Sequence, residues 1–379
     1  MQVRVNLLGL LWVIAVTSHH HASAEELGLN YRSPAGFVCQ EASLTPEKAR
    51  ELARQHAVLT LLKVTEISPE VAENLVTPYI DTFLTLPALE TIDTAAAAKL
   101  SVRRGYLRLW GITSLTPQAA AALVGSPGQG LEITGMRSLT PEVARALVRG
   151  RRNKLGLGLI TLPTDIAEIL AEFPGELWFP RLETLSLEAA AALGKHHKPL
   201  DLGLRSISPQ VAEILLRHDA PIGLANIRKL EPGVGDILAR HKAEVWLALE
   251  EIDSVSLARK LFSEPESPFS VSRLRTMSPP IAAEYAKHSR GEVHSLDGLT
   301  VDAARELAKC NRDISLPAIT EVSPELAIAL TARTRAVYLS GLKSLDGPDA
   351  VRVAEALAST PAPVYIEYLE RISAPALTA

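Results

Sequence analysis

Aromatic residues are scarce in this 379-residue chain, at 4% of the sequence, so the position of each one is informative. The two cysteines, Cys39 and Cys310, are too few for a disulfide framework. The formal net charge is −4 and there are no basic runs, which argues against a nucleic acid or an anionic membrane as partner. No stretch approaches the ~20 apolar residues of a membrane span. With 47% hydrophobic residues the chain can nevertheless bury a large core.

The first 24 residues have the pattern of a secretory signal. Arg4 gives a short positive start, an apolar run follows over 7–16, and small residues occupy 22–24. We therefore expect a signal peptide over 1–24 and a mature chain that is secreted or periplasmic. We expect an N-terminal cap segment over 25–43 and a single domain over 44–379.

One pattern recurs along the rest of the chain. The segments 107–123 (LRLWGITSLTPQAAAAL), 177–193 (LWFPRLETLSLEAAAAL) and 314–330 (ISLPAITEVSPELAIAL) share the consensus L-x-L-x-x-L-x-x-L-[ST]-P-E-x-A-x-x-L. It repeats about fourteen times at a spacing of roughly 23 residues, which is the signature of a repeat architecture.

Each consensus position predicts an element of structure. The alternating L-x-L predicts a short strand, and the hydroxyl or acid that follows it is a typical helix N-cap. Proline often comes next, at the first helical position, where its missing N–H costs nothing. The expected caps are Thr45, Ser68, Asp93, Thr116, Thr140, Pro163, Ser186, Ser208, Glu231, Asp253, Ser278, Thr300, Ser323, Asp346 and Ser373. One unit cannot bury its apolar stripe alone, whereas a stack of units can.

The repeat resembles leucine-rich repeats through its L-x-L core and its period, from about Leu44 to the C-terminus. It is most similar to the short variants of secreted bacterial proteins. This resemblance implies an α/β solenoid with a parallel sheet on the concave face and short helices on the convex face. The asparagine that often follows L-x-L is replaced by apolar residues such as Ile112, Leu182 and Ile319. We therefore expect the turn to be closed by packing.

The stack also bears on the cysteines. Stacked repeats put Cys39 and Cys310 at least ~50 Å apart, far beyond the ~7 Å between Cα atoms that a disulfide allows. Cys39 precedes the first repeat and is expected to be the more exposed of the two. Cys310 is expected to be a small buried apolar residue.

Five of the ten histidines share one repeat phase, ten or eleven residues after their caps: His56, His197, His218, His241 and His288. A metal-binding row along His197, His218 and His241 is one interpretation. A cation that stabilises each helix C-terminus is the favoured one, because neighbouring helices lie ~8–10 Å apart, too far to share an ion. We expect no metal site there and no cofactor.

No motif of an enzyme is present. The sequence has no G-x-S-x-G, no H-E-x-x-H and no C-x-x-C. The prediction is that the chain is not an enzyme, although a catalytic site made of residues distant in sequence is the less favoured alternative.

The aromatic residues give the best indication of function. In L-x-L the apolar residues face the helices, so the middle residue, and those two before and two after it, point to the open face. A solvent-facing Trp or Tyr is a typical anchor for a partner, although strands favour aromatics anyway. The candidate ligand-binding residues are Tyr106, Arg108, Trp110, Trp178, Trp246, Tyr338 and Tyr365.

These observations predict a secreted binding or scaffolding module that holds a protein or peptide on its concave sheet. A glycan or another cell-envelope component is the alternative ligand, since Trp and Tyr also stack on sugar rings. An enzyme with a non-contiguous active site is the third possibility.

Overall fold

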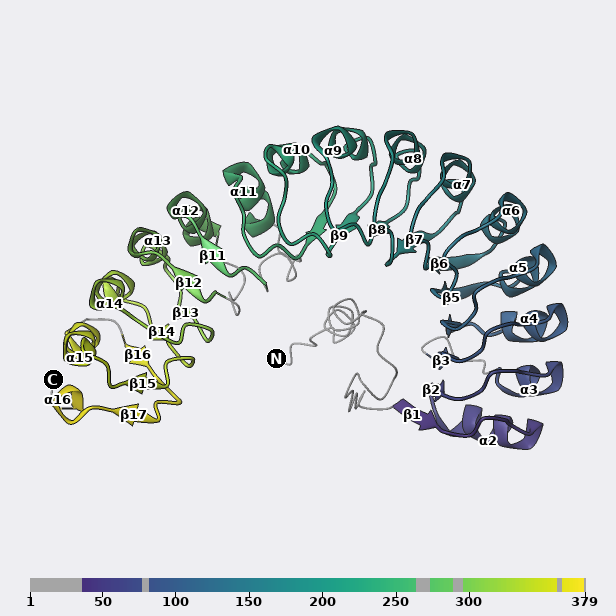
Figure 1. Cartoon of the computed structure of the whole chain (residues 1–379), viewed down its shortest axis with the longest axis horizontal. Helices are drawn as coiled ribbons and strands as arrows, with labels where there is room; N and C mark the ends of the chain where they lie inside the picture. Colours follow the sequence, from purple (N-terminus) through teal and green to yellow (C-terminus); the bar gives the residue numbers. More distant parts are fainter. Residues whose placement is uncertain (1–35, 77–81, 264–272, 289–295, 360–362, 378–379) are drawn as a thin grey trace. The chain divides into compact units, whose positions relative to one another are not determined.

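The computed structural model describes residues 36–76, 82–263, 273–288, 296–359 and 363–377 (Figure 1). The predicted signal over 1–24 lies outside these residues. The chain divides into two compact units. Unit 1 reaches to Arg205 and includes Glu213–Leu224, and unit 2 contains Ser206–Ala212 and continues from Ala225.

Unit 1 alternates short strands with short helices. In chain order its elements are β1 (Gly36–Cys39), α2 (Pro46–Gln55), β2 (Val58–Leu61), α3 (Pro69–Asn74), β3 (Phe83–Thr85), α4 (Thr94–Ser101), β4 (Tyr106–Arg108), α5 (Pro117–Leu123), β5 (Gly128–Ile133), α6 (Pro141–Val148), β6 (Arg152–Leu157), α7 (Thr164–Leu170), β7 (Glu176–Phe179), α8 (Leu187–Leu193), β8 (Leu200–Leu202) and β9 (Ile222–Leu224). Helix α9 (Pro209–Leu215) spans the boundary between the units.

The unit 1 strands β1 to β9 follow one another in sequence order in one sheet, and every pair of neighbours is parallel. The register places the L-x-L motifs side by side, so that Leu107 pairs with Leu131 and Leu155 pairs with Leu177. These leucines are almost fully buried because they face the helices. The architecture confirms the expected α/β solenoid of leucine-rich-repeat type.

Most helices begin where the repeat predicts. In α5 the Thr116 side chain accepts a hydrogen bond from the Ala119 backbone N–H at 3.1 Å, and Pro117 opens the helix. The same side-chain cap, an Oγ or a carboxylate oxygen, is formed at Thr45, Ser68, Asp93, Thr140, Ser186, Ser208, Thr300 and Ser323.

At three places in unit 2 the predicted cap is wrong. Helix α10 (Val234–Ala239) is preceded by Gly233 in a left-handed conformation (φ 82°), two residues after Glu231. Ser254 rather than Asp253 caps α11 (Val255–Ser263), through a bond from the Leu257 N–H. The cap of α15 (Ala350–Ala358) is Asp349 instead of Asp346, with no side-chain bond. The repeat is less regular here, so the loop residues shift the helix start.

Unit 2 continues the pattern with shorter strands. After β10 (Val245–Leu247) and the helices α10 and α11 come β11 (Thr276–Met277), α12 (Pro279–His288), β12 (Gly298–Leu299), α13 (Val301–Leu307), β13 (Ile314–Ser315), α14 (Pro324–Thr331), β14 (Val337–Tyr338), β15 (Ser344–Leu345), α15, β16 (Val364–Tyr365), β17 (Arg371–Ile372) and α16 (Ala374–Leu377). The pairs β11–β12, β13–β14–β16 and β15–β17 are parallel.

The two turns of each repeat are closed in different ways. The turn from strand to helix is closed by packing, as expected, since Ile112, Leu182 and Ile319 are buried. The turn from helix to strand is closed by a buried polar side chain that binds backbone carbonyls. Arg152 donates to the carbonyl oxygens of Ser101, Arg103, Gly105 and Leu123. Arg103 and Arg333 act in the same way.

Histidines take this buried position in three successive repeats, and here the sequence-based assignment needs a correction. The side chain in line with His218 and His241 is His196 rather than His197. Its Nδ1 lies 3.2 Å from the Ala171 carbonyl oxygen, and its ring centroid lies 6.1 Å from that of His218. Burial lowers the pKa of His196, which favours the neutral ring. His197 is exposed and pairs with Asp219 at 3.1 Å.

Both cysteines are free and buried, so the expectation of an exposed Cys39 is wrong. Cys39 is the last residue of β1 and pairs in register with Leu61 of β2. It therefore takes the position of an apolar strand residue that faces the helices. Strand β1 itself lies within 25–43, the segment predicted to be a cap.

Candidate functional site

The described helices of unit 1 cover one side of its sheet, and none of them lies on the other side (Figure 1). Alternation along each strand puts the residues between the buried leucines on this second side. In β4, Leu107 is buried, whereas its neighbours Tyr106 and Arg108 are half-exposed. We call this side the unit 1 strand face. Its aromatic and charged residues are Phe83, Tyr106, Arg108, Trp110, Glu132, Lys154, Glu176, Trp178 and Asp201.

Arg108 is the centre of one group on this face. Its Nε lies 3.2 Å from Oε2 of Glu132, in the neighbouring strand β5. The same carboxylate oxygen accepts a hydrogen bond from the Trp110 indole N–H at 3.3 Å. The guanidinium carbon lies 4.8 Å from the ring centroid of Phe83 and 5.7 Å from that of Trp110. Tyr106 completes the group because it stacks on Phe83, with ring centroids 4.9 Å apart. The group is thus held together by contacts among its own side chains.

Glycines make room for the rings on this face. Tyr106 is paired with Gly130, where an added Cβ would lie 2.7 Å from the tyrosine ring. Trp178 is likewise paired with Gly156, where a Cβ would lie 2.7 Å from the indole. Each ring therefore lies against the backbone of the preceding or following strand. Burial, followed by Glu176 and Glu132, raises the pKa of the Tyr106 hydroxyl, which stays protonated.

A second group lies around Trp178 in β7. The Lys154 ammonium is 5.0 Å from its ring centroid, within the range of a cation–π interaction. Asp201 of β8 is paired with Trp178, is only 8% exposed, and its Oδ2 has no hydrogen-bond partner among the described residues. Burial raises the pKa of Asp201 to about 7, with Lys154 opposing the shift and Glu176 adding to it. This carboxyl therefore titrates near neutral pH.

The other predicted site residues belong to unit 2. Trp246, in β10, is half-exposed, and its indole N–H donates to Glu244 at 3.0 Å. Tyr338 in β14 and Tyr365 in β16 stack with ring centroids 4.7 Å apart, because their strands pair in register. The structure therefore gathers Tyr106, Arg108 and Trp110 into one group of unit 1 and places Trp178 in another. In unit 2, Tyr338 and Tyr365 form a stacked pair, and Trp246 contacts Glu244.

The sequence analysis missed five residues of the unit 1 strand face. Glu132 occupies the same middle position as Arg108 and Trp178, and this phase was the signal that could have identified it. Asp201 also has this phase. Phe83, Lys154 and Glu176 lie two residues before the middle position, level with Tyr106. One of the acids among these residues, Glu132, holds the side chains of Arg108 and Trp110 in place.

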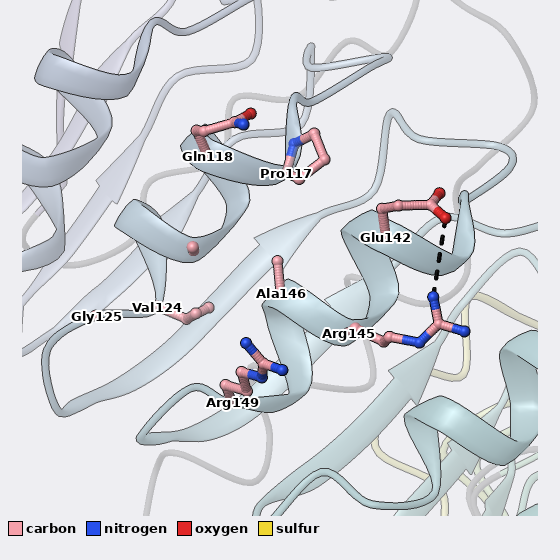
Figure 2. Close-up of a pocket in the computed structure, with 9 residues that line it drawn as sticks. Pro117, Gln118, Val124, Gly125, Glu142, Arg145, Ala146 and Arg149 are labelled. Carbon is pink, nitrogen blue, oxygen red and sulfur yellow. Dashed lines mark ion pairs between the residues drawn. The ribbon is translucent and has the colours of Figure 1, made fainter.

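A hollow on the helix side of unit 1 is the other concave feature of interest. It has a volume of about 390 Å³ and lies between α5 and α6 (Figure 2). Ala121, Val124 and Ala146 form its apolar floor, and an ion pair between Glu142 and Arg145 (3.8 Å) lies at its rim. It arises where small alanines leave space between adjacent helices. None of the predicted site residues lines it.

No group of three or more His, Cys, Asp or Glu side chains placed to hold a metal ion occurs among the described residues. Within the same residues, no helix is long and apolar enough to cross a membrane.

No family model and no curated protein matches the sequence. Among solved structures, a chain of the Toll–Spatzle complex of Drosophila is similar over 89% of this chain and 47% of its own length, at 13% identity and a TM-score of 0.43. A leucine-rich-repeat protein of Leptospira interrogans is similar over 92% and 99% of the two chains, at 15% identity and a TM-score of 0.39. An internalin of Listeria monocytogenes is similar over 88% and 86%, at 11% identity and a TM-score of 0.35. This chain thus spans about half the length of the Toll-complex chain.

Proposed function

We propose that this chain is an exported binding module that holds a protein or peptide partner on the unit 1 strand face. The observation that carries the proposal is the ordered group of Arg108, Trp110 and Glu132 with the stacked rings of Phe83 and Tyr106. Tryptophan, tyrosine and arginine are the residues that contribute most at protein interfaces. Because these side chains are already held in place, little conformational entropy is lost when a partner binds.

The arrangement of the rings supports a protein or peptide over a glycan. A sugar stacks on an open aromatic ring face. The rings of Tyr106 and Trp178 lie against glycine backbone, and each has a further contact, with Phe83 in the first case and Lys154 in the second. What these rings offer to a ligand is mainly their edges and polar groups, which suit the mixed apolar and polar surface of a polypeptide.

Site-specific photo-crosslinking tests the proposed surface. A photoreactive phenylalanine analogue placed at Trp110, which is 39% exposed, should form a covalent adduct with the partner in the source organism. The matched control is Val102, which is 57% exposed and follows α4 at the helix end of the repeat. The same analogue at Trp178 and at Trp246 asks whether the partner also contacts the second group and unit 2.

Adducts at Trp110 and Trp178 without adducts at Val102 are the expected result. Adducts at Val102 alone, or equal adducts at all positions, would show that the partner does not use the unit 1 strand face. A glycan rather than a polypeptide in the Trp110 adduct, identified by mass spectrometry, would favour the alternative ligand class.

Export is part of the proposal and has its own test. The motivation is the pattern of Arg4, the apolar run and the small residues at 22–24. N-terminal sequencing of the protein from its natural host should give a chain that begins at or near Glu25. A folded product that retains Met1 would contradict export through this signal.

A further inference from the structure

The guanidinium of Arg108 is held on three sides. Glu132 contacts its Nε, and the rings of Phe83 and Trp110 contact its planar group. Glu132 is only 5% exposed, and its Oε2 is also bound by the Trp110 indole, so this carboxylate has little freedom to move. An arginine side chain on a surface normally samples many rotamers. Here most of that freedom is already lost in the free protein.

The two terminal Nη atoms are the part of the guanidinium that remains available. The Arg108 side chain is 31% exposed, and none of the described residues accepts a hydrogen bond from either Nη. Nε, by contrast, is shielded from solvent and faces Glu132. The terminal edge of the guanidinium is therefore oriented outward with its donors unused. These donors form a planar fork whose spacing matches the two oxygens of a carboxylate.

Resting on the proposed function, we propose that Arg108 is the receptor for a carboxylate of the bound polypeptide, which accepts one hydrogen bond from each Nη. Trp110 lies beside this receptor and gives the residues next to the carboxylate an apolar contact. Glu132 is a positioning residue, because it acts on the ligand only through Arg108 and Trp110. The partner segment is therefore acidic, and it includes an Asp or Glu side chain or a C-terminal carboxylate.

Glu132 also weakens the attraction for simple anions. Its negative charge lies 3.2 Å from Nε and offsets much of the positive charge of Arg108. A point charge such as chloride gains little from such a pair. A carboxylate that fits both Nη donors gains directional hydrogen bonds that do not depend on net charge alone. We therefore expect Arg108 to bind a carboxylate in preference to a simple anion of the same charge.

The experiment uses the folded full chain and two synthetic hexapeptides, each acetylated at its N-terminus and amidated at its C-terminus. One alternates glycine with glutamate, and the other alternates glycine with glutamine. Binding is followed by NMR through the indole N–H signal of Trp110, identified by its loss in Trp110→Phe. The glutamate peptide should shift this signal and bind about tenfold or more tightly than the glutamine peptide. Sodium chloride, tested alone, should leave the signal unchanged at the same concentration.

Two substitutions separate geometry from charge. Arg108→Lys keeps the positive charge but loses the planar fork, so we expect at least a tenfold loss of affinity for the glutamate peptide. The control is Arg104→Gln, which removes an exposed charge four residues earlier and should leave binding within about twofold. A Glu132→Gln variant should weaken binding less than Arg108→Lys does, because the stacking on Phe83 and Trp110 remains. Urea unfolding checks that each variant is folded.

Three outcomes would overturn the assignment of a carboxylate receptor. They are equal affinity for the two peptides, wild-type affinity in Arg108→Lys, and a chloride-induced shift as large as that of the glutamate peptide. Each can occur while the partner still forms crosslinks to the analogue at position 110. In that case the proposed function is retained, and only the role of Arg108 as carboxylate receptor is rejected. If the chain with the analogue at position 110 and no other substitution forms no crosslinks, the proposed function itself is rejected.

Discussion

Unit 1 and unit 2 are built from the same repeat, but their strands differ in length and in how continuously they pair. In unit 1 the strands β1 to β9 are three to six residues long and form a continuous run of parallel pairs. In unit 2 each described strand from β11 onward has two residues, and these strands fall into separate sheets of two or three. A long register brings side chains from many repeats into rows. That is why the aromatic and charged groups gather in unit 1.

The buried Arg152 of unit 1 also makes more hydrogen bonds than the buried Arg333 of unit 2. Arg152 in unit 1 donates to four carbonyl oxygens, whereas Arg333 in unit 2 donates to three and leaves its buried Nη1 without a partner among the described residues. On the strand face, Phe83 and Tyr106 are joined to Arg108, while Tyr365 stacks on Tyr338 and is 46% exposed. Arg152 thus makes more hydrogen bonds than Arg333, so its removal should cost more free energy of unfolding.

The largest expected effect is at Arg152. Arg152→Ala removes the donors of several buried carbonyl oxygens and leaves a cavity, so we expect a loss of about 5 kcal/mol in the free energy of unfolding. Arg333→Ala should cost less, about 3 kcal/mol, because fewer bonds are lost. Arg149→Ala, an exposed neighbour at the end of α6, is the control and should stay within about 0.5 kcal/mol. Urea unfolding monitored by circular dichroism measures all three.

An Arg333→Ala variant as destabilised as Arg152→Ala would remove this difference between the units. Both arginines would then contribute to their turns alike, whatever the number of carbonyls they contact.

The next effect concerns pH and Asp201. Its pKa is about 7 in the folded chain and near 3.8 when unfolded, so between these values the folded state binds the extra proton. Stability must therefore fall as pH rises from about 4 to 7 and level off above 7. The linked free energy is at most roughly 4 kcal/mol. Asp201→Asn should remove this component and be the more stable protein at pH 8.

Urea unfolding of both proteins at pH 5 and pH 8 checks this slope. Asp219→Asn serves as the control, since the His197 contact lowers the pKa of Asp219 from 3.8 and its carboxylate is therefore ionised at both pH values. If wild type and Asp201→Asn show the same change between the two pH values, Asp201 carries no proton at neutral pH.

Helix capping gives a smaller contrast. Thr116→Ala removes the bond to the Ala119 N–H in unit 1 and should cost about 1 kcal/mol. Glu231→Ala, at the corresponding repeat position before α10, should change stability by less than about 0.5 kcal/mol, because Gly233 rather than Glu231 precedes that helix. Thermal unfolding of the two variants measures both stability losses. A larger loss in Glu231→Ala than in Thr116→Ala would contradict this prediction.

The smallest effect is the coupling within the two ring stacks. A double-mutant cycle of Phe83→Ala and Tyr106→Ala should give a coupling free energy of about 1 kcal/mol, because Arg108 adds a contact to the stack. The cycle of Tyr338→Ala and Tyr365→Ala should give about 0.5 kcal/mol. Equal couplings would mean that the better-ordered surroundings in unit 1 do not strengthen its stack.

The sequence was a good guide where one residue type has one local role. Threonine or serine before proline satisfies a free backbone N–H within its own turn, so the caps of α5 and α14 could be placed without knowledge of the fold. The alternation of L-x-L similarly predicted that Leu107 is buried while Arg108 faces outward. Both depend only on neighbours a few residues away.

The failures occur where the role of a residue depends on an adjacent repeat. His196 and His197 are equivalent in composition and nearly so in phase, and only the carbonyl of Ala171 in the previous repeat selects His196 for burial. Cys39 becomes a core residue because β1 pairs with β2. Glu132 and Asp201 look like ordinary surface acids until the register places them beside Arg108 and Trp178.

The sequence alone therefore determined the repeat, the order of strand and helix, and the side of each strand that faces the helices. The tertiary structure decided which side chains meet: the Arg108, Glu132 and Trp110 group and the buried carboxyl of Asp201 in unit 1, and the stacked rings of Tyr338 and Tyr365 in unit 2. The reason is physical. Periodicity follows from backbone geometry within a few residues, whereas contacts between repeats depend on register and on the space that glycines leave for neighbouring rings.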